Sequence, residues 1–257
     1  MIASRASRYA LRFAALGYLA LLLALPVGLI FYRTFEHGLH PAWSAVTTSG
    51  AQHAFWLTLK VAAIAVPLNT IFGIALAILL VRHRFPGSGF VNALIDVPIA
   101  ISPVVVGIAL YLLYGREGWF SGLHVLFDIK GMVLATMFVS LPFVAREVVP
   151  VLREIGTEQE QAASTLGAGA FATFRRVTLP AIRWAVAYGV VLTTARAIGE
   201  FGAVSVVAGS KQTLPLYVRQ QYDGFDLYGA YAASALLALI AITVVVTLTM
   251  FKPKETI

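Results

Sequence analysis

Six long stretches of apolar residues dominate this sequence of 257 residues and limit the folds open to it. A helix needs about 20 apolar residues to cross the hydrocarbon core of a bilayer, and it satisfies its own backbone hydrogen bonds there. Hydrophobic residues make up 59% of the chain and charged residues only 12%, whereas a soluble domain this apolar would expose large sticky patches. The sequence therefore predicts an all-α, polytopic membrane protein with six transmembrane helices, at roughly 13–31, 58–81, 97–114, 131–151, 184–208 and 227–251.

The segments between these stretches are too short to form separate domains. We therefore expect a single transmembrane domain over residues 1–257, and no internal repeat is evident. Its longest polar connection is the loop 153–183, between the fourth and fifth predicted helices. A connection of that length is expected to have a function besides joining two helices.

The distribution of Lys and Arg predicts the orientation in the membrane, because these residues are enriched in cytoplasmic loops. If the N-terminus is inside, the cytoplasmic segments hold twelve Lys and Arg residues and the outer segments six. The first apolar stretch is longer than the roughly 7–15 residues of a cleavable signal peptide, so we interpret it as a retained helix. Both termini are therefore expected in the cytoplasm. The net charge of +7 follows from this topology, and nucleic-acid binding is not predicted.

Signatures of catalysis and metal binding are absent from the sequence. The chain has no cysteine, and none of its five histidines has the helical spacing of a zinc site. It contains neither a Gly-x-Ser-x-Gly elbow nor the phosphate-binding loop of an ATPase. We therefore predict no catalytic residue, metal site or cofactor, and a membrane enzyme has no candidate chemistry here.

The polar loop 153–183 contains the signals of a short helix. Thr157 and Glu160 have the spacing of a capping box, which predicts a helix beginning at Glu158. Gly167 is suited to the left-handed position that ends a helix, and Pro180 is expected to break the segment that follows. Such a helix could dock into the groove of a partner protein. On these residues alone, an amphipathic loop on the membrane surface is an equal alternative.

Arg196 and Glu200 are ionisable residues inside the fifth predicted span. Placing a charge at the centre of a bilayer costs roughly 2.5–3.5 kcal/mol on insertion scales. At positions i and i+4 of a helix the two side chains can neutralise each other, which predicts a structural ion pair. Two alternatives are direct contact with an anion that crosses the membrane and contact across a subunit interface.

Ser102 and Pro103 lie early in the third predicted span. One interpretation is that Asp96 caps this helix and the prolines occupy its first turns. The other is that Pro103 interrupts the helix, either as a local kink, which we favour, or as a break that lines a cavity.

The polar loop resembles the EAA loop of ABC importer permeases, whose form is Glu-Ala-Ala, three residues, Gly, nine residues and Ile/Val-x-Leu-Pro. Gln161 stands where the family usually has Glu, and Glu160 precedes it. The matching residues are Ala162, Ala163, Gly167, Val177, Leu179 and Pro180. The resemblance implies a type I importer permease of MetI-like fold. It also implies that Glu158, Glu160, Gln161, Ala162, Ala163, Gly167 and Pro180 couple the chain to an ATPase.

Further segments resemble the sulfate/thiosulfate importers, specifically their W-type membrane subunit. These are 82–87, 95–107, 141–147, 195–204 and 213–216, within a likeness that covers roughly 55–250. Molybdate permeases are similar in the EAA loop and in 195–202, but they more often have Pro-Pro at Ser102-Pro103 and usually lack the Arg146-Glu147 pair. The resemblance thus favours sulfate or thiosulfate, with molybdate or tungstate as the alternative. We place Ser102, Pro103, Arg196 and Glu200 in the expected translocation pathway on their own chemistry, as interrupted backbone and charge inside the predicted spans.

The same resemblance implies the partners and the location of the chain. An importer of this type contains two copies of an ABC ATPase subunit, a second permease that is usually a related but different chain, and an extracytoplasmic sulfate-binding protein. The complex lies in the bacterial inner membrane. A secondary anion transporter working alone is the remaining alternative, although such proteins usually contain repeats with broken helices at matching positions.

Overall fold

The computed structural model describes the backbone of residues 5–251 and the side chains of Tyr9 and of residues 11–247, and this part of the chain is helical, without strands. The side chains of Arg5 and Arg8, which count toward the predicted orientation, lie outside the described residues. Lys252, Lys254 and the two ends of the predicted domain 1–257 also lie outside them.

Five helical segments are long and apolar enough to cross a membrane, and a bent helix pair is the sixth candidate. The predicted all-α membrane fold is therefore confirmed. The first segment contains α1 (Arg5–Leu19), the π-helical turn η1 (Ala20–Ala24) and α2 (Leu25–Phe35). The others are α4 (Ser49–Arg82), α7 (Ile129–Ser140) with α8 (Pro142–Glu154), α10 (Ala170–Thr173) with the π-helical turn η3 (Phe174–Thr178) and α11 (Leu179–Ile198), and α14 (Leu227–Phe251). The bent pair is α5 (Ser88–Ala100) and α6 (Pro103–Tyr114).

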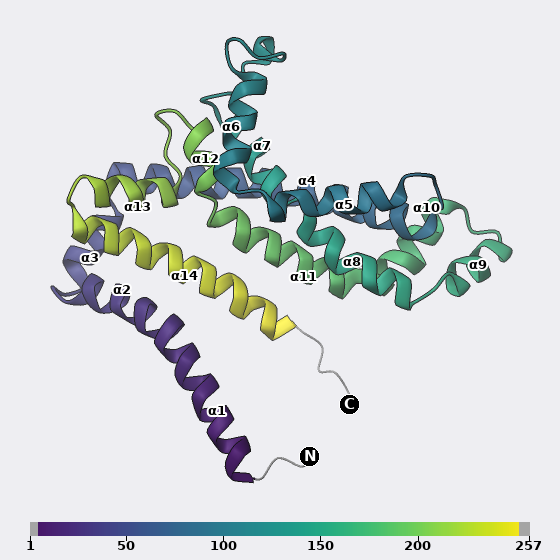
Figure 1. Cartoon of the computed structure of the whole chain (residues 1–257), viewed down its shortest axis with the longest axis horizontal. Coiled ribbons are helices and arrows are strands. Elements are labelled where there is room, and N and C mark those ends of the chain that lie inside the picture. Colours follow the sequence, from purple (N-terminus) through teal and green to yellow (C-terminus); the bar gives the residue numbers. More distant parts are fainter. Residues whose placement is uncertain (1–4, 252–257) are drawn as a thin grey trace.

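Shorter helices lie at the two ends of the long axis of the molecule (Figure 1). At one end α3 (Leu39–Val46) and α13 (Leu214–Asp223) pack beside the start of α4, and at the other end lies α9 (Glu158–Thr165). The 34 residues of α4 extend for about 51 Å, which exceeds the roughly 30 Å of a hydrocarbon core. Part of α4 therefore projects beyond the membrane. Near the start of α4 the Thr58 hydroxyl accepts the backbone N–H of Leu214 at 2.7 Å.

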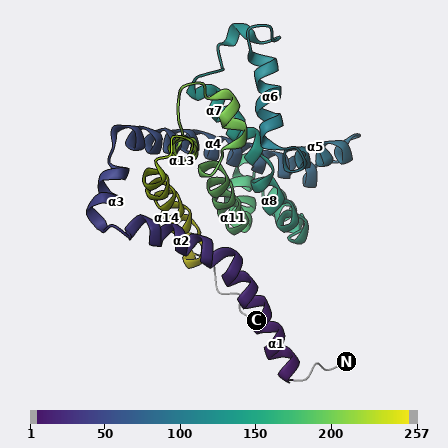
Figure 2. The same cartoon turned by 60° about the vertical axis from the view of Figure 1, so that its left-hand side comes forward.

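Two predicted spans differ from the helices in the structure. The segment 97–114 is divided between α5 and α6, whose axes meet at 108°. The C-terminal end of α6 projects beyond the other helices, while its start packs beside α7 and α12 (Figures 1 and 2). The segment 184–208 belongs to a helix that begins at Ala170 and ends at Ile198, followed by the separate helix α12 (Gly202–Val207). The prediction that Pro180 breaks the chain is wrong, because Pro180 occupies the first turn of α11 directly after η3 and the helix continues through it.

Two glycines allow α4 and α11 to approach α8 closely. A Cβ atom at Gly73 in α4 would lie 2.7 Å from the Cβ atom of Val144 in α8, and one at Gly189 in α11 would lie 2.8 Å from the Val144 Cα atom. Val144 is fully buried between them. Small residues commonly permit such contact between membrane helices. As a result α8, which leads into the polar loop, is packed tightly between α4 and α11.

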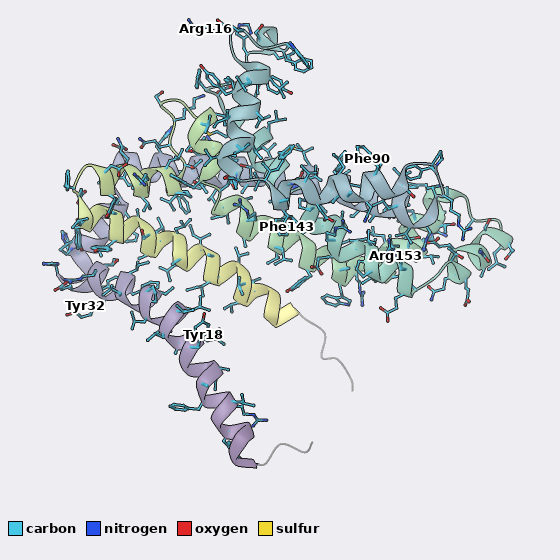
Figure 3. All side chains as sticks on the ribbon, viewed as in Figure 1. Tyr18, Tyr32, Phe90, Arg116, Phe143 and Arg153 are labelled. Atoms are coloured by element: carbon cyan, nitrogen blue, oxygen red, sulfur yellow. The ribbon has the colours of Figure 1, made fainter. Side chains whose placement is uncertain are left out.

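The loop between α6 and α7 carries the short 3-10 helix η2 (Ser121–Leu123) and packs against the end of α12. Arg116 lies in this loop, at the tip of the α6 projection (Figure 3). The backbone N–H of Phe127 donates to the carbonyl of Val207 at 2.9 Å, and the Lys211 ammonium donates to the Asp128 carboxylate. That hydrogen bond from Lys211, followed by one from the backbone of Ile129, lowers the pKa of Asp128.

We expect the Asp128–Lys211 ion pair to stabilise the fold at neutral pH and to lose this contribution only in acid. Because the folded pKa of Asp128 is lowered, the contribution is fully present above the ordinary value of 3.8 and disappears as the pH falls through the folded pKa. Thermal unfolding of the wild type and of Asp128→Asn between about pH 7 and pH 3 measures this. The difference between the two midpoints should begin to shrink below about pH 4. A difference that narrows already between pH 7 and pH 5 would contradict the prediction.

Candidate functional site

Helix α9 has the boundaries that its sequence signals predict. It begins at Glu158, and Gly167 ends it with a left-handed φ of +85°. The N–H of Gly167 donates to the carbonyl of Ser164 at 2.9 Å, and the N–H of Ala168 donates to that of Ala163 at 3.0 Å. This is the hydrogen-bond pattern of a Schellman motif, in which a glycine at the left-handed position avoids the strain that a Cβ atom brings.

The predicted capping box is wrong. No side-chain cap bonds the start of α9, and the Thr157 hydroxyl instead accepts the Gln161 side-chain amide at 3.0 Å. The Glu160 carboxylate turns toward the body of the protein rather than back to the helix start. It has a stronger partner there, since an ion pair outcompetes a hydrogen bond to a backbone N–H.

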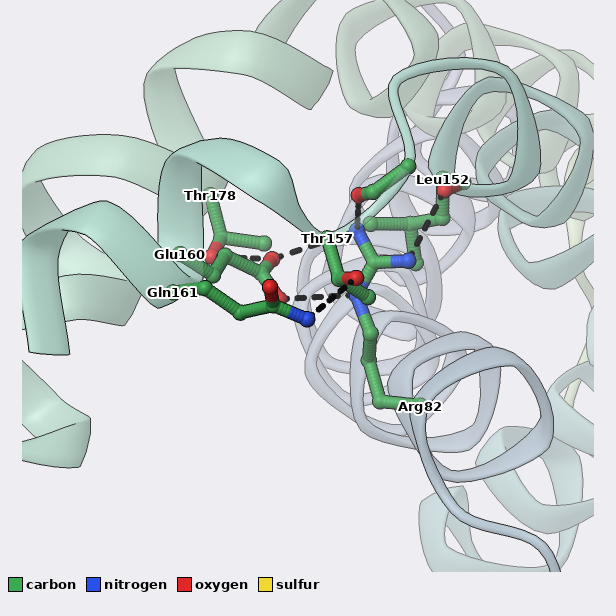
Figure 4. A network of polar contacts seen from close by, with 7 residues as sticks. Arg82, Leu152, Thr157, Glu160, Gln161 and Thr178 are labelled. Carbon is green, nitrogen blue, oxygen red and sulfur yellow. Dashed lines mark hydrogen bonds and ion pairs between the residues drawn. The ribbon is translucent and has the colours of Figure 1, made fainter.

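Arg82, the last residue of α4, holds the start of the polar loop (Figure 4). Its guanidinium contacts the Glu160 carboxylate at 2.9 Å, and the Thr178 hydroxyl donates to the same carboxylate at 2.8 Å. Arg82 also donates to the carbonyls of Leu152 at 2.9 Å and Gly156 at 2.7 Å. One largely buried side chain thus joins the end of α4, the end of α8, α9 and, through Thr178, the helix that follows.

We expect Glu160→Ala to loosen α9 without unfolding the membrane helices. The change leaves Arg82 its two carbonyl acceptors but removes its carboxylate partner, and hydrogen bonds to charged groups contribute about 1.5–3 kcal/mol. Hydrogen exchange of residues 157–165 should become faster. The matched control is Glu158→Ala, at an exposed residue in the same turn. Equal exchange rates in the two variants would show that the Arg82 contact does not hold α9.

The outer face of the polar loop exposes apolar side chains. Leu166 is 88% exposed and Phe171 is 75% exposed, on either side of Gly167. Ala162 and Pro180 are also exposed, and Ala163 is half-buried. This face lies at the end of the molecule opposite α3 and α13 (Figure 1). Apolar side chains this exposed on small, closely approachable segments are typical of a surface that a partner covers.

A second group of predicted residues lies where two helices are interrupted. Ser102 precedes α6 without a capping hydrogen bond from its side chain, and Pro103 is the first residue of that helix. Of the two forms of interruption, the structure has the break rather than the favoured local kink. The alternative in which Asp96 caps this helix is wrong, because Asp96 lies inside α5 and its carboxylate accepts hydrogen bonds from Arg146.

The interruption between α11 and α12 packs directly against the one between α5 and α6. A Cβ atom at Gly202 would lie 2.9 Å from the Cβ atom of Pro103, and one at Gly107 would lie 2.7 Å from the carbonyl oxygen of Ala203. Helices α6 and α12 are therefore in close backbone contact. Broken helices at membrane depth are tolerated where the freed backbone groups are satisfied or line a cavity.

Arg196 and Glu200 form the predicted ion pair, at 2.5 Å, but at the end of a helix rather than in its middle. Arg196 is in the last turn of α11, and Glu200 follows the helix. The second carboxylate oxygen of Glu200 accepts the backbone N–H of Ala203 at 2.8 Å and so caps α12. Glu200 is only 2% exposed, whereas Arg196 is 30% exposed. Arg196 therefore remains partly accessible while it neutralises a buried carboxylate.

The structure thus brings most of the predicted residues together in two places. One is the exposed face of α9 and the residues that follow it up to Phe171, called here the α9 surface, and the other is the paired helix interruptions. Pro180 lies apart from α9, in the first turn of α11. Sequence reasoning missed Arg82 and Thr178, which fix the orientation of α9. A usable signal for Arg82 was its position directly after a long apolar stretch, where a charged residue faces the polar loops. No local pattern marks Thr178 as its neighbour.

Solved structures with the same arrangement of helices are ABC transporters. A bacterial alginate ABC transporter in complex with its periplasmic protein contains a chain that superposes with a TM-score of 0.74 at 16% identity, covering 96% of this chain and 94% of that one. A chain of the MetNI methionine ABC transporter in inward-facing conformations gives a TM-score of 0.62 at 19% identity, covering 77% of this chain and 92% of that one. At these identities the likeness establishes the fold.

Sequence comparison identifies nearer relatives. The sulfate transport system permease protein CysW of Synechocystis sp. is 48% identical over 233 residues, covering 87% of this chain and 84% of that protein. Its counterpart in Escherichia coli is 46% identical over 242 residues, covering 90% of this chain and 81% of that protein. Residues 69–252 match the family described as binding-protein-dependent transport system inner membrane components. The chain belongs to this family of importer permeases.

Proposed function

We propose that this chain is the membrane-spanning permease subunit of an ATP-driven importer of sulfate or thiosulfate. The proposed substrate rests on one observation. This chain is 46–51% identical, over more than four fifths of its length, to proteins named sulfate transport system permease. The chain contributes the pathway and not the ATPase chemistry, since its relatives are named as permeases. The molybdate alternative has no comparable support.

The exposed face of α9 is the proposed contact with the ATPase. Leu166 and Phe171 would enter a groove of that subunit, and the small side chains of Ala162 and Ala163 would allow close approach. Glu158 and Gln161 are exposed beside them, whereas Glu160 acts by holding α9 to Arg82. The proposed complex contains two ATPase copies, a second and different permease, and an extracytoplasmic sulfate-binding protein. It lies in the bacterial inner membrane with α9 and both termini of this chain in the cytoplasm.

The paired interruptions are the proposed translocation pathway. Ser102 is exposed at the N-terminal end of α6, where the helix dipole favours an anion. Pro103, the first residue of α6, would keep the preceding chain from continuing this helix. The partly exposed Arg196 would supply positive potential, and Glu200 would fix the position of Arg196. A direct role of Arg196 toward the anion and its pairing role with Glu200 are separated by replacing both residues with glutamine.

Uptake of labelled sulfate by cells with and without this chain tests the proposed function. Loss of uptake on deletion, restored by the chain and unaffected by excess molybdate, is the expected result. Unchanged sulfate uptake after deletion would refute the substrate, and labelled molybdate would then be tested. Competition by unlabelled thiosulfate shows whether the two anions share the pathway.

We expect Gly167→Val to impair docking of the ATPase. A β-branched residue at a φ of +85° costs about 1–2 kcal/mol in backbone strain, although no atom within 4 Å would meet its Cβ atom. The end of α9 should therefore change direction, and less ATPase should co-purify with the permease. Gly169→Val is the matched control, because Gly169 lies in the same loop with an ordinary φ of −71° and similar open space. Wild-type co-purification and uptake in Gly167→Val would remove the claim.

A further inference from the structure

A dense set of hydrogen bonds joins α8 to α5 through Arg146. Its Nε atom donates to one oxygen of Asp96 at 2.7 Å and an Nη atom to the other at 2.6 Å. The guanidinium also donates to the Asn92 side-chain oxygen at 3.1 Å and the Asn92 carbonyl at 2.9 Å. All three of its nitrogen atoms therefore bond to α5, in a fork geometry that fixes distance and orientation.

The two helices joined in this way lead to the two parts of the candidate site. Helix α8 ends at Glu154 and is separated from α9 by only three residues. Helix α5 ends at Ala100, directly before the interruption at Ser102. If α8 moves together with α9, the contacts that attach α5 to α8 would therefore transmit that movement to the interruption at Ser102.

Apolar packing of α5 is sparse. Ile95 and Pro98 are its only buried residues, while Phe90, Leu94 and Ile99 are more than half exposed. In contrast, α8 buries six residues between α4 and α11. Because α5 has so few apolar contacts, its attachment to α8 depends mainly on the hydrogen bonds from Arg146.

We propose that the Arg146–Asp96 link transmits movement of the α9–α8 segment to the interruption between α5 and α6. The inference rests on the proposed function, because it concerns coupling between ATPase docking and the pathway. Arg146 is in this sense a positioning residue that acts through α5 rather than on the transported anion. The alternative is that each charge merely neutralises the other so that the helices insert into the membrane.

Three sets of variants separate these roles in the reconstituted complex with its ATPase. Asp96→Asn with Arg146→Gln removes both charges together, so insertion is retained while the ion pair is lost. Asp96→Arg with Arg146→Asp exchanges the charges, and Arg146→Lys keeps the charge but loses the fork. We expect the neutral pair to lower sulfate uptake per ATP hydrolysed by about fivefold to tenfold, the lysine variant to lower it less, and the exchanged pair to recover part of it. A wild-type ratio in the neutral pair would overturn the proposal.

A distance measurement can overturn the proposal even if the neutral pair fails to assemble. The natural chain has no cysteine, so cysteines placed at the exposed residues Leu94 in α5 and Arg153 in α8 can carry spin labels. The distance between these labels should be unchanged between the nucleotide-free and ATP-bound complex, because the link makes α5 and α8 move together. A change between those states in the otherwise wild-type chain would overturn the proposal. A complex that hydrolyses ATP without sulfate uptake would refute the substrate instead, since the distance test requires only nucleotide.

Discussion

Replacing Arg196 by alanine is expected to lower the yield of folded protein and to abolish transport. The change removes the 2.5 Å ion pair and leaves the Glu200 carboxylate, which is 2% exposed, without its charged partner. Breaking a buried ion pair from one side typically costs about 3–5 kcal/mol. The cost falls on the junction of α11 and α12, because Glu200 also caps α12. The amount of monodisperse protein in detergent and labelled sulfate uptake measure the two effects.

A double variant separates the pairing role of Arg196 from contact with the anion. Arg196→Gln with Glu200→Gln removes both charges, and the glutamine oxygen can still accept the N–H of Ala203. The yield should recover in this variant. Recovered uptake as well would mean that Arg196 acts only through Glu200, whereas recovered yield without uptake indicates a direct effect on the anion. Wild-type yield together with wild-type uptake in Arg196→Ala would rule out both roles.

Gly73→Val is expected to destabilise the membrane domain more than substitutions elsewhere in α4. Its Cβ atom would lie 2.7 Å from the Cβ atom of Val144, which is fully buried and has no room to move. Overpacking of this kind typically costs about 1–3 kcal/mol, and here α11 closes the opposite side of Val144 through Gly189. The expected result is a lower thermal unfolding midpoint and a lower yield in detergent.

The matched control for this variant is Gly89→Val in α5. Gly89 is also helical, but nothing lies within 4 Å of its Cβ position. The control should unfold near the wild-type midpoint, because it carries the same change in side chain without the contact. Similar losses in both variants would indicate that helix propensity, rather than the contact with Val144, sets the cost.

The features that could be predicted from the sequence are those determined by short stretches of chain. Apolar length identifies the membrane helices, and Gly167 marks the end of α9 because the left-handed position depends on its own backbone. The start of α9 at Glu158 is also as predicted, although the capping box on which that prediction rested does not form. Fold class and family resemblance rest on such local signals, and the comparisons bear both out.

The features that could not be predicted depend on contacts between distant residues. Glu160 has the spacing of a capping box, but Arg82, 78 positions earlier, takes its carboxylate. The 108° bend between α5 and α6 depends on the packing of α6 against α12, and a proline by itself is compatible with a kink or a break. The position of Glu200 beyond the end of α11 likewise depends on the separate helix that it caps.

The continuity of the helix from Ala170 to Ile198 has a mechanical consequence. Its 29 residues form a rod of about 43 Å whose one end borders the α9 surface and whose other end carries Arg196. A tilt of about 5° around its midpoint would displace each end by about 2 Å in opposite directions, so the rod acts as a lever. The helix also fixes the direction in which Arg196 points relative to the polar loop. One inserted residue would turn Arg196 by about 100° around the helix axis. Under the proposed function, the length of this helix therefore matters for transport as much as the residues at its two ends.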